Sequence, residues 1–140
     1  MAVRARDVLA QVPLFADLAP RYLKRLGDRM EEQRFMEGAR VVKYGDIGDT
    51  FHVILEGEAK VLAPDGRVVN RLRPGEFFGE ISLLDGGPRT ATVVAETPMR
   101  MLALSRPAFR ELIEHEPGVS VAMLKHVASM LRRLERPASD

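Results

Sequence analysis

The spacing of hydrophobic and polar positions changes twice along the chain. Up to residue 32, apolar residues recur three or four positions apart, as Leu23, Leu26 and Met30 do, which indicates helix. Between residues 33 and 105 the apolar residues form short β-rich runs separated by glycine, aspartate and proline. Helical spacing returns over residues 106–135. This order predicts an α+β domain with helices before and after a β region.

The β region is expected to be an antiparallel, jelly-roll-like β-roll of about eight short strands, because turn residues recur every 8–12 positions or so. The runs that read as strands are 41–42, 51–55, 59–62, 68–69, 90–95 and 99–104. Asp65-Gly66 is the strongest hairpin signal, since glycine tolerates the positive φ that a tight turn needs.

The flanking regions are expected to be helical. In the lead-in, residues 1–32, one helix ends before Pro13 and a second begins at Pro20, with Asp17 or Ala19 as its N-cap. The region 106–135 is expected to hold two helices, hinge and lid, the first capped by Ser105 and the second running from about residue 119 to 135. With a tail at 136–140, the prediction is a single domain over residues 1–140.

The last helix carries an apolar stripe. On a helical wheel its members fall within an arc of about 80°; they are Val119, Met123, Val127, Met130 and Leu134. His126 and Arg133 flank the stripe, and Arg132 lies on the far side. The stripe predicts packing on the β region or on a second copy of itself, so a homodimer through the C-terminal helix is also an expectation.

Composition narrows the classes of function. The 140 residues are 46% hydrophobic and 29% charged, which is ordinary for a globular domain. A net charge of +1 disfavours direct binding to nucleic acid through a broad basic surface. The absence of cysteine excludes disulfides and thiolate metal sites, and no apolar run approaches the roughly 20 residues of a membrane span. These features predict a cytoplasmic protein without a membrane segment.

Candidate chemistry is concentrated in residues 77–93. The pattern there is strand, glycine, short helical turn, Gly-Gly-Pro loop and strand, so Gly79 allows close approach of the backbone and the residues after it can present free N–H groups. The guanidinium of Arg89 suits a phosphate, and Glu80 suits the hydroxyl groups of a ribose. Taken singly, Arg89 could be a solvated charge, Glu80 a helix cap and Gly79 a bulge.

This segment resembles a known family. Phe78-Gly79-Glu80-Ile81-Ser82-Leu83-Leu84 and Pro88-Arg89-Thr90-Ala91-Thr92-Val93 are similar to the phosphate-binding cassette of cyclic-nucleotide-binding domains, found in protein kinase A regulatory subunits, cyclic-nucleotide-gated channels and the catabolite activator protein. The resemblance extends upstream to Gly45-Asp46-Ile47-Gly48-Asp49 and the strand after it, and to Val12-Pro13-Leu14-Phe15. It implies a regulatory domain whose ligand is cAMP or cGMP, with no further cofactor.

The resemblance also implies roles for individual residues in a cassette over 77–90. Arg89 would pair with the cyclic phosphate, and Glu80 would accept a hydrogen bond from the ribose 2′-hydroxyl. The remaining phosphate and sugar contacts would come from Gly79, Ile81, Ser82 and Thr90. Val61 and Val69 would cover the base, and Arg133 would approach it from the edge of the lid helix. Thr90 leaves cGMP open as a ligand, and we favour cAMP.

No catalytic pattern is evident. None of the histidines, His52, His115 and His126, belongs to an HExxH pair or a metal-ligand cluster, so we expect a domain that is not an enzyme. A cupin-like enzyme would need metal ligands that these histidines are poorly placed to supply. The segment after Glu135 is too short for a DNA-reading module, so the output is expected to pass through an unknown protein partner or a fused effector. The alternative is a ligand-independent interaction domain of the same fold, and the presence of both Glu80 and Arg89 argues against it.

Overall fold

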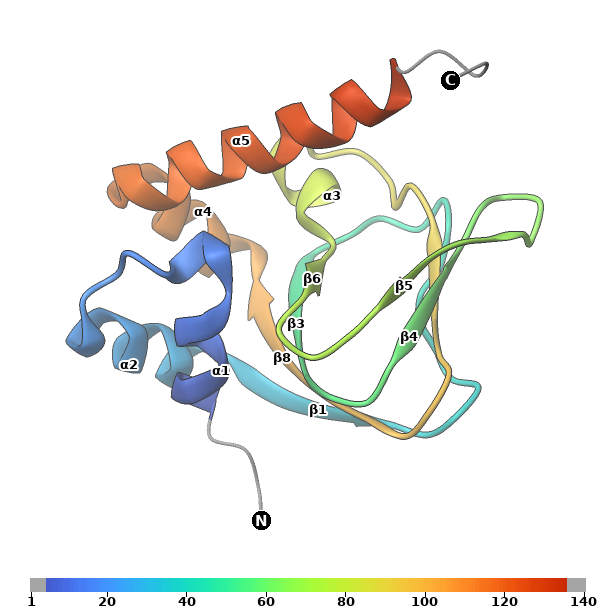
Figure 1. Cartoon of the computed structure of the whole chain (residues 1–140), viewed down its shortest axis with the longest axis horizontal. Helices are drawn as coiled ribbons and strands as arrows, with labels where there is room; N and C mark the ends of the chain where they lie inside the picture. The colour runs from blue at the N-terminus through green and yellow to red at the C-terminus, as the bar shows by residue number, and fades with distance from the viewer. Residues whose placement is uncertain (1–4, 136–140) are drawn as a thin grey trace.

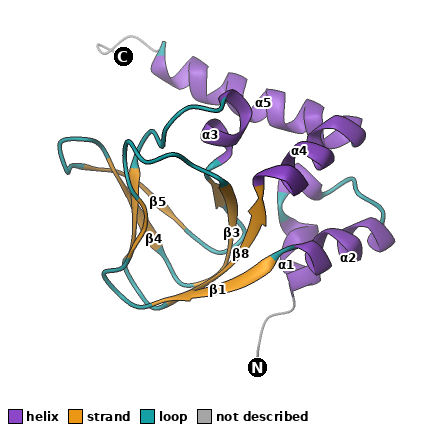
Figure 2. Ribbon diagram, turned by 180° about the vertical axis from the view of Figure 1, so that it is seen from behind, coloured by secondary structure: helices purple, strands orange, loops and turns teal. Residues whose placement is uncertain are grey.

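The computed structural model describes residues 5–135, which form a β-roll with helices gathered on one side (Figures 1 and 2). The helical elements are α1 (Ala5–Gln11), the 3₁₀ helix η1 (Pro13–Phe15), α2 (Pro20–Arg29), α3 (Glu80–Asp85), α4 (Arg106–His115) and α5 (Pro117–Leu134). The strands are β1 (Glu31–Phe35), β2 (Arg40–Val42), β3 (Thr50–Glu56), β4 (Ala59–Leu62), β5 (Val68–Leu72), β6 (Phe77–Phe78), β7 (Thr92–Ala95) and β8 (Met99–Ser105).

The strands form two four-stranded antiparallel sheets, ordered β1-β8-β3-β6 and β2-β7-β4-β5. Strand β3 is buried along almost its whole length because both of its faces pack. Phe51, Val53 and Leu55 point toward the helices, whereas Ile54 points into the roll. The predicted fold class is therefore confirmed, and the roll has one core inside it and a second between sheet and helices.

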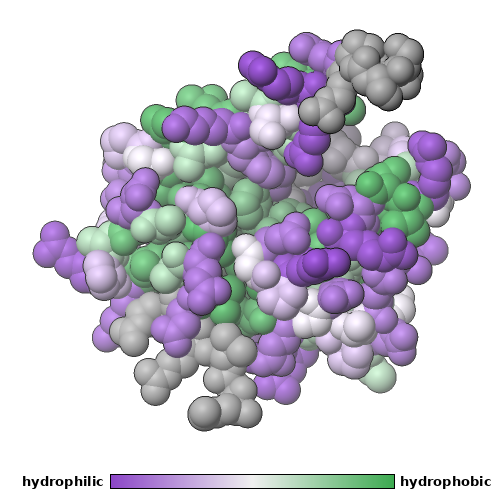
Figure 3. Space-filling model, in the orientation of Figure 1, coloured by the Kyte–Doolittle hydropathy of each residue, from purple (hydrophilic) through white to green (hydrophobic). Residues whose placement is uncertain are grey.

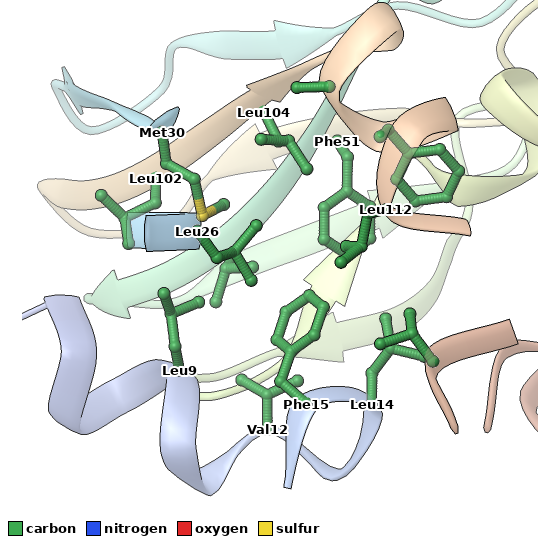
Figure 4. Close-up of a cluster of buried hydrophobic side chains, with 14 of the residues drawn as sticks. Leu9, Val12, Leu14, Phe15, Leu26, Met30, Phe51, Leu102, Leu104 and Leu112 are labelled. Atoms are coloured by element: carbon green, nitrogen blue, oxygen red, sulfur yellow. The ribbon is translucent and has the colours of Figure 1, made fainter. Parts of the chain in front are cut away.

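The helix-side core is drawn in Figure 4, where Phe51 lies among side chains from η1, α2, α4 and β8. The Phe51 ring centroid lies 5.2 Å from that of Phe109 and 6.3 Å from that of Phe15. Val119 and Met123 of α5 belong to the same core. The first half of the apolar stripe on α5 thus packs inside the domain, whereas Leu134 at its end is 83% exposed.

Several elements differ from the sequence-based expectations, and one of them is β5, which extends to Leu72 rather than ending at residue 69. Strand β1 was not predicted, because Glu31–Phe35 contains one apolar residue; it is an edge strand, where polar side chains face water. Strand β7 begins at Thr92 rather than at residue 90. Helix α5 begins at Pro117, because a proline in the first turn needs no helical N–H donor; the break between α4 and α5 falls at Glu116.

The predicted Ser105 cap and the predicted turn at Gly66 are confirmed, and the structure decides between the two N-cap candidates of α2. Ala19 is the N-cap of α2, and the Ser105 side chain accepts a hydrogen bond from the Ala108 amide at the start of α4. Gly66, with φ of +88°, lies in the hairpin between β4 and β5. Within the described residues, no helix has both the length and the hydrophobicity to cross a membrane.

Candidate functional site

Gly79 joins β6 to α3 and is the N-cap of that helix, with φ of +93°. A residue with a Cβ atom would be strained at this φ, and there is also no room for the Cβ atom. A Cβ atom at this position would lie 2.7 Å from Arg89 Nη1 and 2.8 Å from the Thr50 carbonyl oxygen. The glycine therefore brings the first turn of α3, whose N–H groups have no helical acceptor, directly against Arg89.

Arg89 is held in a buried position by neutral oxygen atoms. Its side chain donates from Nη1 to the Gly79 carbonyl at 3.2 Å, and from Nη2 to the Thr50 carbonyl at 2.9 Å and the Thr50 hydroxyl at 3.1 Å. Its backbone is fixed too, since Arg89 N donates to Asp46 O at 2.7 Å and Gly45 N donates to Arg89 O at 3.0 Å. The protein's own oxygen atoms and backbone contacts thus orient the guanidinium.

The turn before β3 packs directly on this arginine. A Cβ atom on Gly48 would lie 2.6 Å from Arg89 Nε and 2.7 Å from Ser82 Cβ. Arg106, the first residue of α4, donates hydrogen bonds from its side chain to Gly48 O and from its backbone to Asp49 O. The Gly48 turn therefore connects Arg89 to the start of α4, and its steric role had no signal in the sequence beyond the glycine itself.

The positive charge of Arg89 has no carboxylate in direct contact with it among the described residues. Burial lowers the pKa of Arg89, while the nearby charges of Asp49 and Glu80 act in the opposite direction. An arginine remains protonated despite such a shift. Among residues 5–135, no carboxylate lies within ion-pair distance of its guanidinium. The arrangement is suited to a ligand anion.

Glu80 is the first residue of α3 and is 6% exposed. Its Oε1 lies 3.0 Å from Nε2 of His126 on α5. Its Oε2 is buried and has no hydrogen-bond partner among the described residues. Sequence reasoning placed His126 only at the edge of a stripe, because nothing local indicates that α5 crosses above α3, as Figures 1 and 2 show.

A cavity of about 440 Å³ opens between α3, β4, β5 and α5. This volume is in the range of small-molecule sites. Eight of the sequence-predicted residues line it: Val61, Gly79, Glu80, Ile81, Ser82, Arg89, Thr90 and Arg133. Val69 does not line this cavity and is 54% exposed, because side chains alternate along β5 and its neighbour Asn70 points inward instead.

Helix α5 covers one side of the cavity. Met130, His126 and Arg133 line the cavity, whereas Met123 lies in the helix-side core. No group of histidine, aspartate and glutamate side chains that could hold a metal ion occurs in the described part of the chain. The cavity thus combines two arginines, Arg89 and Arg133, and two carboxylates, Glu76 and Glu80, with the ring of His126 and apolar strand residues.

The comparison with known proteins agrees with this geometry. The family model described as cyclic nucleotide-binding domain matches residues 32–116. The cAMP-dependent protein kinase regulatory subunit of Colletotrichum orbiculare is 36% identical over 114 residues, which are 81% of this chain and 29% of that protein. The CRP-like cAMP-activated global transcriptional regulator of Mycobacterium tuberculosis is 31% identical over 138 residues, 96% of this chain and 62% of that protein.

The fold comparison points the same way. The crystal structure of the Thermus thermophilus catabolite activator protein superposes with a TM-score of 0.80 at 31% identity, over 88% of this chain and 60% of that one. The chain thus spans less than two thirds of the length of these relatives. The family match covers most of the β-roll and all of α3 and α4, including Glu80 and Arg89. The chain belongs to the cyclic nucleotide-binding domain family.

Proposed function

We propose that this domain binds a cyclic purine nucleotide in the cavity beside α3, and that it binds cAMP more tightly than cGMP. The observation that carries the proposal is the presence of Arg89 and Glu80 in one cavity. Arg89 is a buried cation without a carboxylate partner among the described residues, and Glu80 has a buried oxygen without a donor. An anion and a hydroxyl group on one ligand would satisfy both.

Each part of the ligand has a candidate partner. The phosphate would accept from Arg89, from Thr90 and from the first-turn amides of α3, at Ile81 and Ser82. The ribose 2′-hydroxyl would donate to Glu80. The base would lie toward Val61 on β4 and Met130 on α5.

The preference for adenine or guanine depends on fewer protein groups than recognition of the phosphate and ribose does. Thr90 is exposed at the cavity wall and could accept from a guanine 2-amino group, whereas Arg133 lies at the α5 rim. The two curated relatives described above carry cAMP in their names. These names support cAMP as the preferred ligand.

The output would be a rearrangement of α5. This helix covers the cavity and packs in the helix-side core through Val119 and Met123, so a ligand that shifts one end changes the packing of the other. We propose a regulatory rather than catalytic role in the cytoplasm, with the change read by a fused effector or a protein partner.

Calorimetric titration of nucleotide-free protein with cAMP and cGMP tests the proposal, with adenosine 5′-monophosphate as the acyclic control. We expect a dissociation constant near the micromolar range for cAMP, since about 22 heavy atoms contribute roughly −0.3 kcal/mol each. Binding of cGMP should be weaker. Folded protein that gives no heat with either cyclic nucleotide, and no signal in a second binding assay, would favour the ligand-independent interaction domain.

Replacing Glu80 with glutamine is expected to weaken cAMP binding by about tenfold, because a neutral amide accepts a hydroxyl proton less strongly than a carboxylate. The affinity for 2′-deoxy-cAMP should change by less than about twofold. Glu114→Gln makes the same chemical change at an exposed position on α4, outside the cavity lining, and serves as the control. Equal losses of affinity for both nucleotides would contradict the hydrogen bond between Glu80 and the ribose 2′-hydroxyl.

We also propose a homodimer, through a different face of α5 from the predicted stripe. Val119 and Met123 are buried within the domain, so they are not available to a second copy. Exposed apolar residues follow a three-four-three spacing along another side of the helix, at Val121, Leu124, Ala128 and Leu131. Figure 3 shows hydrophobic residues at the surface along the upper left edge, where Figure 1 places α5. This is the spacing of a two-helix seam.

Replacing Leu124, which is 70% exposed, with glutamate is expected to convert the dimer to a monomer, because like charges would face each other across the two-fold axis. Size-exclusion chromatography with light scattering measures the mass, with and without cAMP. Ser129→Glu adds the same charge on another side of α5 and should leave the dimer intact. A monomeric unmodified protein in both conditions would refute the dimer.

A further inference from the structure

Within the described part of the chain, His126 and Glu80 each make a single side-chain hydrogen bond, to one another, and it joins α5 to α3 at the cavity. A carboxylate has only acceptors, so Nε2 of His126 must be the donor, either as the neutral Nε2–H tautomer or as imidazolium.

The His126 ring is held by a second contact. Its centroid lies 4.7 Å from that of Phe77, with 52° between the planes, and Phe77 immediately precedes the Phe78-Gly79 approach to α3. The ring is thus supported on one side by β6 while its Nε2 reaches Glu80. Histidine here has a defined orientation and is not a solvated surface group, since its side chain is 30% exposed.

The two oxygens of Glu80 have different surroundings. Oε1 takes the hydrogen bond from His126, whereas Oε2 is buried without a partner among residues 5–135. A buried carboxylate oxygen without a donor is unfavourable, and a ligand hydroxyl would remove that cost. With Oε1 occupied, rotation of the carboxylate is restricted, and Oε2 is the oxygen left for the ligand.

From this geometry we propose that His126 is a positioning residue of the nucleotide site: by holding Oε1 of Glu80 it presents Oε2 to the ribose 2′-hydroxyl. The inference rests on the proposed function and adds to it. It makes recognition of the sugar depend on the position of α5, because withdrawal of that helix removes the donor from Glu80. The docked helix and the bound ribose thereby stabilise each other through one carboxylate.

A competing role for His126 predicts the opposite effect. If the histidine occupied the place of the ligand hydroxyl, its removal would tighten nucleotide binding. The separate environments of Oε1 and Oε2 favour positioning over competition. The sign of the affinity change therefore separates the two roles.

The test measures calorimetric affinities of His126 variants for cAMP and 2′-deoxy-cAMP, or for the cGMP pair if cGMP binds more tightly. His126→Phe keeps a ring beside Phe77 and removes the donor, whereas His126→Gln keeps a donor. We expect His126→Phe to weaken binding of the ribose nucleotide by about fivefold and to leave binding of the 2′-deoxy nucleotide within about twofold. His126→Gln should recover most of the loss.

The remaining outcomes overturn the inference. Equal losses of affinity for both nucleotides would indicate that His126 acts through packing alone. Tighter binding would indicate competition with the ligand hydroxyl, and unchanged affinity would show that His126 does not contribute to ribose recognition. His126→Ala is a second donor-free variant, and circular dichroism with thermal melting confirms that each variant is folded. Unmodified protein that binds no cyclic nucleotide would instead refute the proposed function itself.

Discussion

Replacing Arg89 with alanine is expected to weaken cAMP binding by roughly 30- to 1,000-fold, which corresponds to about 2–4 kcal/mol. The phosphate would lose its charge-assisted donor. The replacement also leaves the carbonyl oxygens of Gly79 and Thr50 without the hydrogen bonds that Arg89 donates. Calorimetric titration of the folded variant measures the effect.

Two further variants make this result interpretable. Arg89→Lys retains the charge but not the fork that bonds Gly79 and Thr50 together, so it should bind with intermediate affinity. Arg110→Ala removes the same kind of charge from an exposed position on α4 and should leave the affinity unchanged. An Arg89→Ala protein with unmodified affinity would show that the phosphate binds elsewhere.

The second large effect concerns stability against acid and arises at His52. This side chain is 3% exposed in β3, stacked on Phe78 with 4.8 Å between ring centroids. Burial, and then the charge of Arg89, lowers the pKa of His52 to about 4, from 6.5 for an unburied histidine. Between these two pH values the unfolded chain binds more protons than the folded one, so acid favours unfolding.

The free energy of unfolding should accordingly fall by up to about 1.4 kcal/mol per pH unit between pH 6.5 and 4, and by about 3 kcal/mol in total. This stability is fully present above pH 6.5. Urea unfolding at a series of pH values measures it. His52→Phe keeps a flat ring against Phe78 and cannot titrate, so its curve should be flatter by this amount, and parallel curves would contradict the assignment.

Elements of the fold could be predicted where their own residues carry a clear hydrophobic pattern or capping side chain. Strand β3 was evident because its residues are apolar on both faces, and Ser105 was evident as a cap because its side chain acts within its own turn. Strand β1 was missed because only pairing with β8 makes Glu31–Phe35 extended. An edge strand with polar side chains has no periodic signal of its own.

The candidate site divides in the same way. Gly79, Glu80 and Arg89 could be selected because their chemistry is compressed into one short segment. Val69 was predicted to cover the base whereas Asn70 lines the cavity, since the sequence does not reveal which residues of β5 face inward. Gly48, in the turn before β3, and His126, on α5, belong to segments that are distant in the chain from residues 77–93. Only the fold brings them to the site.

The amino-acid sequence alone therefore determined the succession of a helical region, a β region and a second helical region, and the residues able to recognise an anion and a hydroxyl group. Both depend on neighbours a few positions apart, where backbone preference and side-chain chemistry act directly. Only the tertiary structure decided which half of the α5 stripe is buried, which face of α5 stays exposed, and that His126 holds Glu80. Those contacts depend on how α5 crosses α3, which is set by packing of the whole helix-side core around Phe51 rather than by any local pattern.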